Sequence, residues 1–182
     1  LEENSILIER SLELQQQRYL DLDSRLLELS SIQNNLSSDN PEQDLAISDE
    51  QEEEKLLYKN ALELFEASRF AEALEIFSEV IITYPKGIYT PDAYFWSGEL
   101  FLAQELYEDA KLSYAEVFEQ FPKHIRAADS LYKLGEIQRI ESNFTQAVNY
   151  FEKVISLFPE SGAAQLSKKS LKIIKEESNL ID

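Results

Sequence analysis

The sequence predicts an all-α protein with an N-terminal parallel coiled coil, three helical hairpins and a C-terminal capping helix. Two observations support this prediction. Aliphatic residues recur at alternating spacings of three and four over residues 1–36, which is the period of a helix that packs along another helix. A set of small, aromatic and proline positions then recurs every 37 residues, which is typical of stacked helical repeats.

The segment 1–36 is the predicted oligomerisation segment. It contains neither Gly nor Pro, and Arg18 and Asp23 fall at the g and following e positions that pair between parallel chains. The side chains at the a and d positions of the heptads form an apolar seam, which a partner helix of a coiled coil would bury. The alternative is a single amphipathic helix packed on the repeat domain. The seam residues expected to drive oligomerisation are Leu1, Ile8, Leu12, Gln15, Tyr19, Leu22, Leu26 and Leu29.

The segment 37–54 is predicted to be an acidic flexible linker. It carries eight acidic residues and neither Lys nor Arg. Sparse apolar content, Pro41 and charge repulsion favour an extended chain. A bound acidic motif is the alternative.

Residues 55–182 form the predicted repeat domain, with repeats at about 54–87, 91–124 and 128–161 and a capping helix at about 163–177. Small residues let paired helices approach, aromatic residues fill the space between hairpins, and a proline ends each second helix. The matching columns are Ala61, Gly98 and Gly135; Ala73, Ala110 and Ala147; Phe77, Tyr114 and Phe151; Val80, Val117 and Val154; and Pro85, Pro122 and Pro159.

These columns resemble the tetratricopeptide repeat, in which the first helix of each hairpin lines a concave groove that binds other proteins. In that groove we expect aromatic residues to contact a partner, and Glu99 and Glu136 to receive a basic residue. Packing of helix on helix is the alternative, and Trp96 is expected in the core. The residues that the resemblance places in the groove are Tyr58, Leu62, Phe95, Glu99, Leu102, Tyr132, Glu136 and Arg139. A competing surface is the off-seam face of the coiled coil, formed by Ile6, Leu7, Leu14, Leu20 and Leu27.

Composition argues against several functions. The chain has 17 Lys and Arg against 35 Asp and Glu, a net charge of −18, which disfavours nucleic acid and anionic membranes. With no Cys and the single His124 it offers no usual metal site. We therefore expect no enzyme activity, cofactor, small-molecule substrate or membrane span. The acidity either keeps the chain soluble or attracts a basic protein partner.

The motif QQQRYLDLDSRL (15–26), the polar linker and the three repeats resemble the periplasmic cell-division coordinator of the Tol–Pal system, the CpoB/YbgF family. The resemblance implies a homotrimeric coiled coil, a periplasmic location with the signal peptide removed before Leu1, and binding to TolA and a bifunctional penicillin-binding protein. The function it implies is a non-catalytic adaptor that coordinates outer-membrane constriction with septal cell-wall synthesis. The alternatives are a scaffold or chaperone-like subunit of another envelope assembly, and a cytoplasmic regulatory subunit.

Overall fold

The computed structural model describes residues 17–29 and 49–179. Within these ranges all regular structure is helical, so the all-α prediction is confirmed for the described chain. Residues 17–29 form a helix, which we call the N-terminal helix. The helices that follow are α2 (Asp49–Glu66), α3 (Phe70–Thr83), α4 (Thr90–Ala103), α5 (Tyr107–Gln120), α6 (Arg126–Ile140), α7 (Phe144–Leu157) and α8 (Gly162–Asn179).

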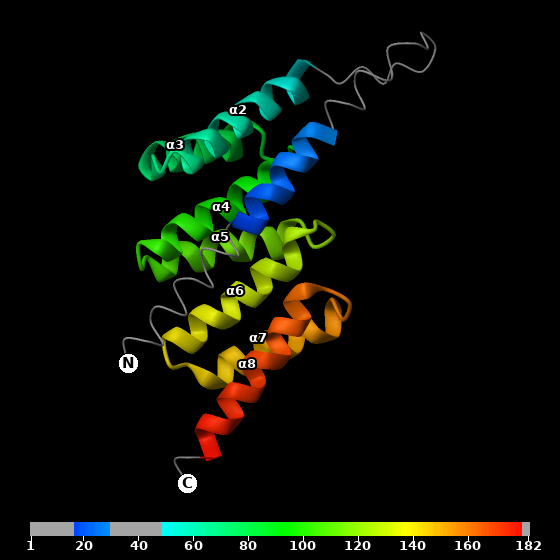
Figure 1. Ribbon diagram of the computed structural model, residues 1–182. Helices are drawn as coiled ribbons and strands as arrows, with labels where there is room; N and C mark the ends of the chain where they lie inside the picture. Colours follow the sequence, from blue (N-terminus) through cyan, green and yellow to red (C-terminus); the bar gives the residue numbers. More distant parts are fainter. Residues whose placement is uncertain (1–16, 30–48, 180–182) are drawn as a thin grey trace.

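Helices α2 to α7 form three hairpins that stack side by side (Figure 1). Helix α2 pairs with α3, α4 with α5, and α6 with α7. Helix α8 packs on both α6 and α7, so it takes the place that the first helix of a fourth hairpin would occupy. Such units bury their apolar faces only against their neighbours, which explains why a capping helix closes the stack.

The turns inside the hairpins share one backbone conformation. Ser68, Glu105 and Ser142 follow the first helices at intervals of 37 residues and have φ values of 59°, 59° and 63°. A residue in the left-handed region commonly ends a helix, because its turn satisfies the last carbonyl groups. At the other end of each hairpin, proline follows shortly after the second helix and prevents its continuation.

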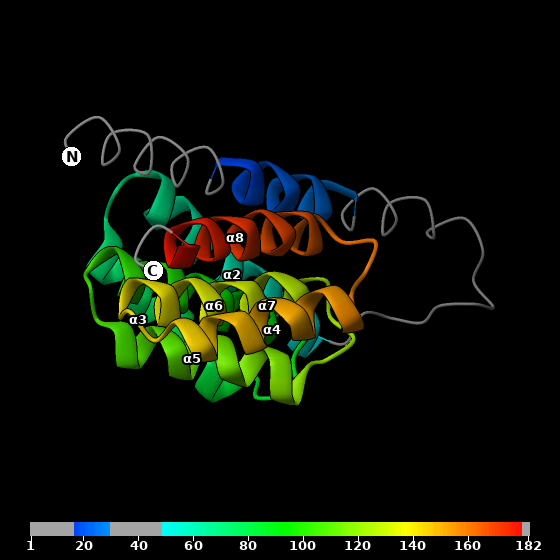
Figure 2. The same cartoon turned by 90° about the horizontal axis from the view of Figure 1, so that it is seen from below.

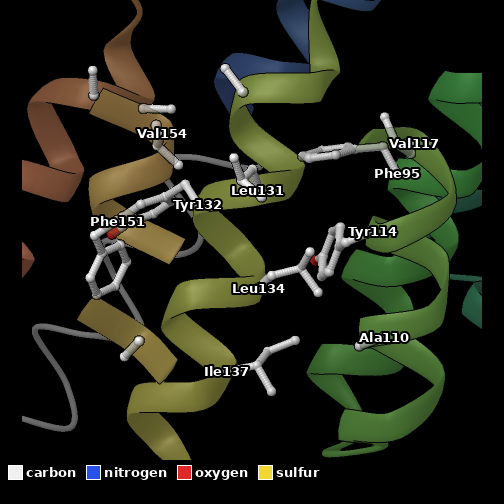
Figure 3. Close-up of a cluster of buried hydrophobic side chains, with 14 of the residues drawn as sticks. Phe95, Ala110, Tyr114, Val117, Leu131, Tyr132, Leu134, Ile137, Phe151 and Val154 are labelled. Carbon is white, nitrogen blue, oxygen red and sulfur yellow. The ribbon is translucent and has the colours of Figure 1, made fainter. Parts of the chain in front are cut away.

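The core is built from small residues that face aromatic rings. A Cβ atom on Gly98 would lie 2.7 Å from the Tyr114 ring, and one on Gly135 would lie 2.6 Å from the Phe151 ring. Figure 3 shows Tyr114 lying between α5 and the Leu134 side of α6, with Phe151 on the opposite side of α6. The recurring glycines therefore set the close approach between the two helices of a hairpin, as the repeat columns predicted.

Replacing Gly135 by alanine is expected to lower the free energy of unfolding by about 1–3 kcal/mol, because the added methyl group overlaps the buried Phe151 ring. The helix propensity gained by alanine, roughly 1 kcal/mol, offsets part of this loss. Urea denaturation measures the change. Gly162→Ala is the matched control, since a Cβ there meets no atom within 4 Å. Equal stability of the two variants would contradict this account of the core.

The predicted linker is wrong in its last part. Helix α2 begins at Asp49, so residues 49–54 are helical and not extended. Acidic residues stabilise the first turns of a helix through the helix dipole. Glu54 also accepts hydrogen bonds from the backbone N–H groups of Ile88 (3.0 Å) and Tyr89 (2.7 Å), which fixes the loop before α4. The rest of the predicted linker, 37–48, lies outside the described residues.

Candidate protein-docking face

The N-terminal helix lies on the side of the domain opposite α3, α5 and α7 (Figure 2). The Tyr19 ring packs edge-on against Phe95, with 4.9 Å between ring centroids, and against Trp96 at 6.4 Å. Leu20 and Leu27 are half-buried against the apolar cluster of the first hairpin and α4. For residues 17–29 the structure therefore describes the alternative interpretation, a single amphipathic helix packed on the repeat domain.

The side chain of Asp23 is held by donors from three different helices. Tyr58 of α2 donates a 3.0 Å hydrogen bond from Oη to Oδ2 of Asp23, and Trp96 of α4 donates a 2.7 Å bond from Nε1 to the same oxygen. Arg126 of α6 donates from Nη2 to Oδ1. Asp23 is only 2% exposed. We call Tyr58, Trp96 and Arg126 the carboxylate pocket, and these three residues with Phe95 the docking face.

Arg126 is 1% exposed and is fixed in place from several sides. Its Nε donates a 2.9 Å hydrogen bond to Oδ1 of Asp92. Its guanidinium carbon lies 4.9 Å from the centre of the Tyr19 ring and 4.8 Å from the centre of the Phe95 ring. Such a planar cation can both stack on aromatic rings and form two charge-assisted hydrogen bonds. Asp92 therefore holds the guanidinium ready for a second carboxylate.

The buried carboxyl groups around Arg126 have perturbed pKa values. Burial raises the pKa of Asp23 to about 6, against the opposing effect of the Arg126 guanidinium. Burial likewise raises the pKa values of Asp92 and Asp129. Burial and the positive charge of Arg126 lower the pKa of His124 to about 4, so this histidine is neutral at pH 7. Arg126 thus provides the positive charge that compensates the buried carboxylates.

A second buried ion pair corrects the prediction that Glu99 receives a partner's basic residue. Glu99 is 1% exposed, and its carboxylate lies 2.7 Å from Lys133 Nζ of α6. Tyr114 donates a hydrogen bond from Oη to the same carboxylate. Glu99 is therefore neutralised inside the domain. Glu136 is half-buried and pairs with Arg139 at 2.9 Å, on the same helix.

The other predicted groove residues divide between two environments. Tyr58 and Phe95 contact the N-terminal helix, and Leu62 lines a surface pocket together with Leu27 of that helix. Tyr132 points toward α7 and packs on Phe151 with 5.6 Å between centroids (Figure 3). Leu102 is half-buried against the core. Two of the predicted aromatic groove residues, Tyr58 and Phe95, thus belong to the docking face.

The predicted oligomerisation residues lie only partly in the described chain. Leu1, Ile8, Leu12 and Gln15 fall outside it. Tyr19 is turned into the docking face, whereas Leu22, Leu26 and Leu29 are exposed by 41%, 40% and 61%. Self-association through residues 1–36 stays a prediction.

The sequence interpretation missed the polar residues of the docking face. Asp23 was assigned to the flank of a coiled coil, and Arg126 was not singled out. Trp96 lies in the core as expected, and its indole N–H also donates to Asp23. One signal was present in the sequence, because Asp92 and Asp129 recur 37 residues apart near the starts of α4 and α6. Charged side chains are seldom buried unless they are paired, so an acid that recurs with the repeat columns indicates a buried partner charge.

Stacked hairpins of this kind are the architecture of a helical-repeat protein. Two family models, both described as tetratricopeptide repeat, match residues 58–125 and 129–161. The chain therefore contains a tetratricopeptide repeat domain.

Comparison with solved structures supports the same fold. The Arabidopsis OM64 TPR domain is similar with a TM-score of 0.55 at 14% identity, covering 67% of this chain and 96% of that chain. PcrH in complex with the chaperone binding region of PopB is similar with a TM-score of 0.54 at 15% identity, covering 68% of this chain and 94% of that chain. At these identities the likeness shows the fold alone. No curated protein matches the sequence.

Across residues 17–29 and 49–179, no helix is long and apolar enough to cross a membrane. In the same ranges no group of three or more His, Cys, Asp or Glu side chains is arranged to hold a metal ion.

Proposed function

We propose that the chain is a non-catalytic adaptor that binds a helical segment of a partner protein on its docking face. The observation that supports this most directly is the N-terminal helix itself, which lies on that face. Laying an amphipathic helix against an apolar surface is a common mode of peptide recognition. A face that accepts such a helix from its own chain has the shape and chemistry to accept one from another protein.

We propose further that the adaptor works in the periplasm in the Tol–Pal system, binding TolA and a bifunctional penicillin-binding protein. The support is the sequence resemblance of residues 15–26, the acidic segment and the three repeats. Self-association is supported by the exposed residues Leu22, Leu26 and Leu29, which lie one helical turn apart on the solvent side of the N-terminal helix. The proposal of a homotrimer rests on the sequence resemblance. In this role the adaptor would coordinate outer-membrane constriction with septal cell-wall synthesis.

A second candidate is a scaffold or chaperone-like subunit of another envelope assembly. One structural neighbour, PcrH, was solved in complex with the chaperone binding region of PopB. This supports a role in holding a segment of another protein. The two candidates share the docking face and differ in the partner.

Binding of purified TolA to the full-length protein tests the first candidate. The opened variant Tyr19→Ser/Asp23→Ala removes the two anchors of the N-terminal helix. If TolA uses the docking face and the helix covers it about 90% of the time, the opened variant should bind TolA about tenfold more tightly. Biolayer interferometry measures the affinities, and circular dichroism verifies that the variant is folded.

Leu26→Glu is the matched control on the solvent side of the same helix, and sedimentation equilibrium reports its self-association. If Leu26→Glu loses TolA binding and the opened variant binds TolA no more tightly than the wild type, TolA binds the coiled-coil seam and not the docking face. If neither the wild type nor the opened variant binds TolA, the Tol–Pal proposal is rejected and the second candidate is favoured.

A further inference from the structure

The carboxylate pocket has donors that the repeat domain itself does not satisfy. Tyr58 Oη, Trp96 Nε1 and Arg126 Nη2 all donate to Asp23, and the described chain shows no other acceptor for them. Arg126 Nη1 is buried and has no hydrogen-bond partner in the described chain. Buried donors without acceptors destabilise the folded chain. The pocket therefore favours an occupant that brings a carboxylate.

The occupant must also bring an aromatic ring one helical turn before that carboxylate. Tyr19 and Asp23 are four residues apart, so they lie on the same face of the N-terminal helix. The Tyr19 ring covers Phe95 and the Arg126 guanidinium while Asp23 enters the pocket. Leu20 and Leu27 extend the contact toward the first hairpin. The docking face thus fits a helix with an aromatic residue at position i and an acidic residue at i+4.

The group that faces the occupant's carboxylate is a cation, although the chain as a whole is acidic. With a net charge of −18, the chain as a whole would attract a basic partner. The docking face instead presents the buried cation Arg126, already paired on one side with Asp92. Short-range hydrogen bonds to a desolvated cation outweigh a screened long-range field at physiological salt. An acidic helix is therefore the fitting ligand, although the surface around it is acidic.

We propose that the docking face is a recognition site for a partner helix carrying an aromatic residue at i and Asp or Glu at i+4, and that Tyr19 and Asp23 occupy this site as an internal ligand. This inference rests on the proposed use of the docking face for protein binding and specifies the chemistry of the partner. Because the N-terminal helix belongs to the same chain, it competes at a high effective concentration. A partner helix binds when it displaces the internal one.

The probe is a fluorescein-labelled peptide of residues 15–31 of this chain, added to the full-length protein. It is titrated against the wild type and against the opened variant Tyr19→Ser/Asp23→Ala, with fluorescence anisotropy as the readout. We expect binding about tenfold tighter to the opened variant, because its own helix no longer covers the face. Quenching or shift of the single Trp96 fluorescence reports occupancy of the pocket.

Two substituted peptides make the test specific. The Asp23→Asn peptide keeps the shape and removes the charge, and it should bind the opened variant about tenfold more weakly. The Leu26→Glu peptide changes one of the exposed leucines of the N-terminal helix and should bind as tightly as the unsubstituted peptide. In a second protein variant, Trp96→Phe added to the opened variant removes one donor and should weaken binding severalfold.

The outcomes separate the inference from the proposed function. If the Asp23→Asn peptide binds as tightly as the unsubstituted peptide, the pocket does not select a carboxylate and the inference is overturned. The docking face would still stand as a proposed protein-binding site. If only the Leu26→Glu peptide loses binding, the peptide binds by forming a coiled coil with the N-terminal helix of the protein. That result would also overturn the inference. Absence of binding of every peptide to a folded opened variant would reject both the inference and the proposed docking face.

Discussion

Replacing Lys133 by methionine is expected to lower the free energy of unfolding by about 3–5 kcal/mol, the range for removing one partner of a buried ion pair. Lys133 and Glu99 are almost completely buried between α6 and α4, with 2.7 Å between Nζ and the carboxylate. Without the lysine, the described chain leaves the Glu99 carboxylate the hydrogen bond from Tyr114 and no other. Neither helix can move away from the other without opening the stack, so the charge stays buried and uncompensated.

The double variant Lys133→Met/Glu99→Gln is the matched control. It removes both charges and leaves an amide oxygen that can accept the Tyr114 hydrogen bond, so most of the lost stability should return. Urea denaturation followed by far-ultraviolet circular dichroism measures both variants. A single variant as stable as the wild type, or a double variant less stable than the single one, would contradict a buried Glu99–Lys133 pair.

The repeat domain was predictable because its information is local and periodic. Gly98 and Gly135 recur with the aromatic residues Tyr114 and Phe151 that fill the space above them. Each hairpin repeats the same small-against-large contact, so one period in the sequence specifies the whole stack. The prolines mark the ends of the second helices for an equally local reason.

The docking of the N-terminal helix could not be predicted in the same way. Heptad spacing shows that Leu22, Leu26 and Leu29 share a face, but it does not identify what covers the other face. Asp23 and Arg126 pair across 103 residues of sequence, and no local pattern connects them. Charged side chains are mostly exposed, so Glu99 was expected to face a partner in the groove, and its buried partner Lys133 could not be identified from local sequence.

Tyr19 connects the two roles predicted for the N-terminal helix. It falls at a seam position of the heptad pattern, yet its ring lies 4.9 Å from Phe95 in the docking face. One ring cannot occupy both places, so a coiled coil that buries Tyr19 in its seam must release the docking face. If the chain self-associates through this seam, as predicted, self-association and the proposed partner binding on the docking face are coupled. Leu22, Leu26 and Leu29 are exposed in the described arrangement.

Replacing Phe77 by alanine is the second large effect that we expect, with a loss of about 3–5 kcal/mol in the free energy of unfolding. Phe77 is fully buried in the first hairpin, and its ring lies 6.0 Å from that of Tyr58. The substitution leaves a cavity beneath α2 that the flanking helices can close only in part. A melting temperature lower by on the order of 10 °C should accompany it.

Ile82→Ala on the same helix is the control, because Ile82 is 79% exposed and its truncation should change stability by less than about 0.5 kcal/mol. Differential scanning calorimetry on the full-length protein compares the two variants. Because Tyr58 rests on Phe77 and donates to Asp23, Phe77→Ala should also weaken the hold of the docking face on the N-terminal helix. An unchanged melting temperature for Phe77→Ala would mean that the assigned register of the repeats, and with it the position of Tyr58 in the docking face, is wrong.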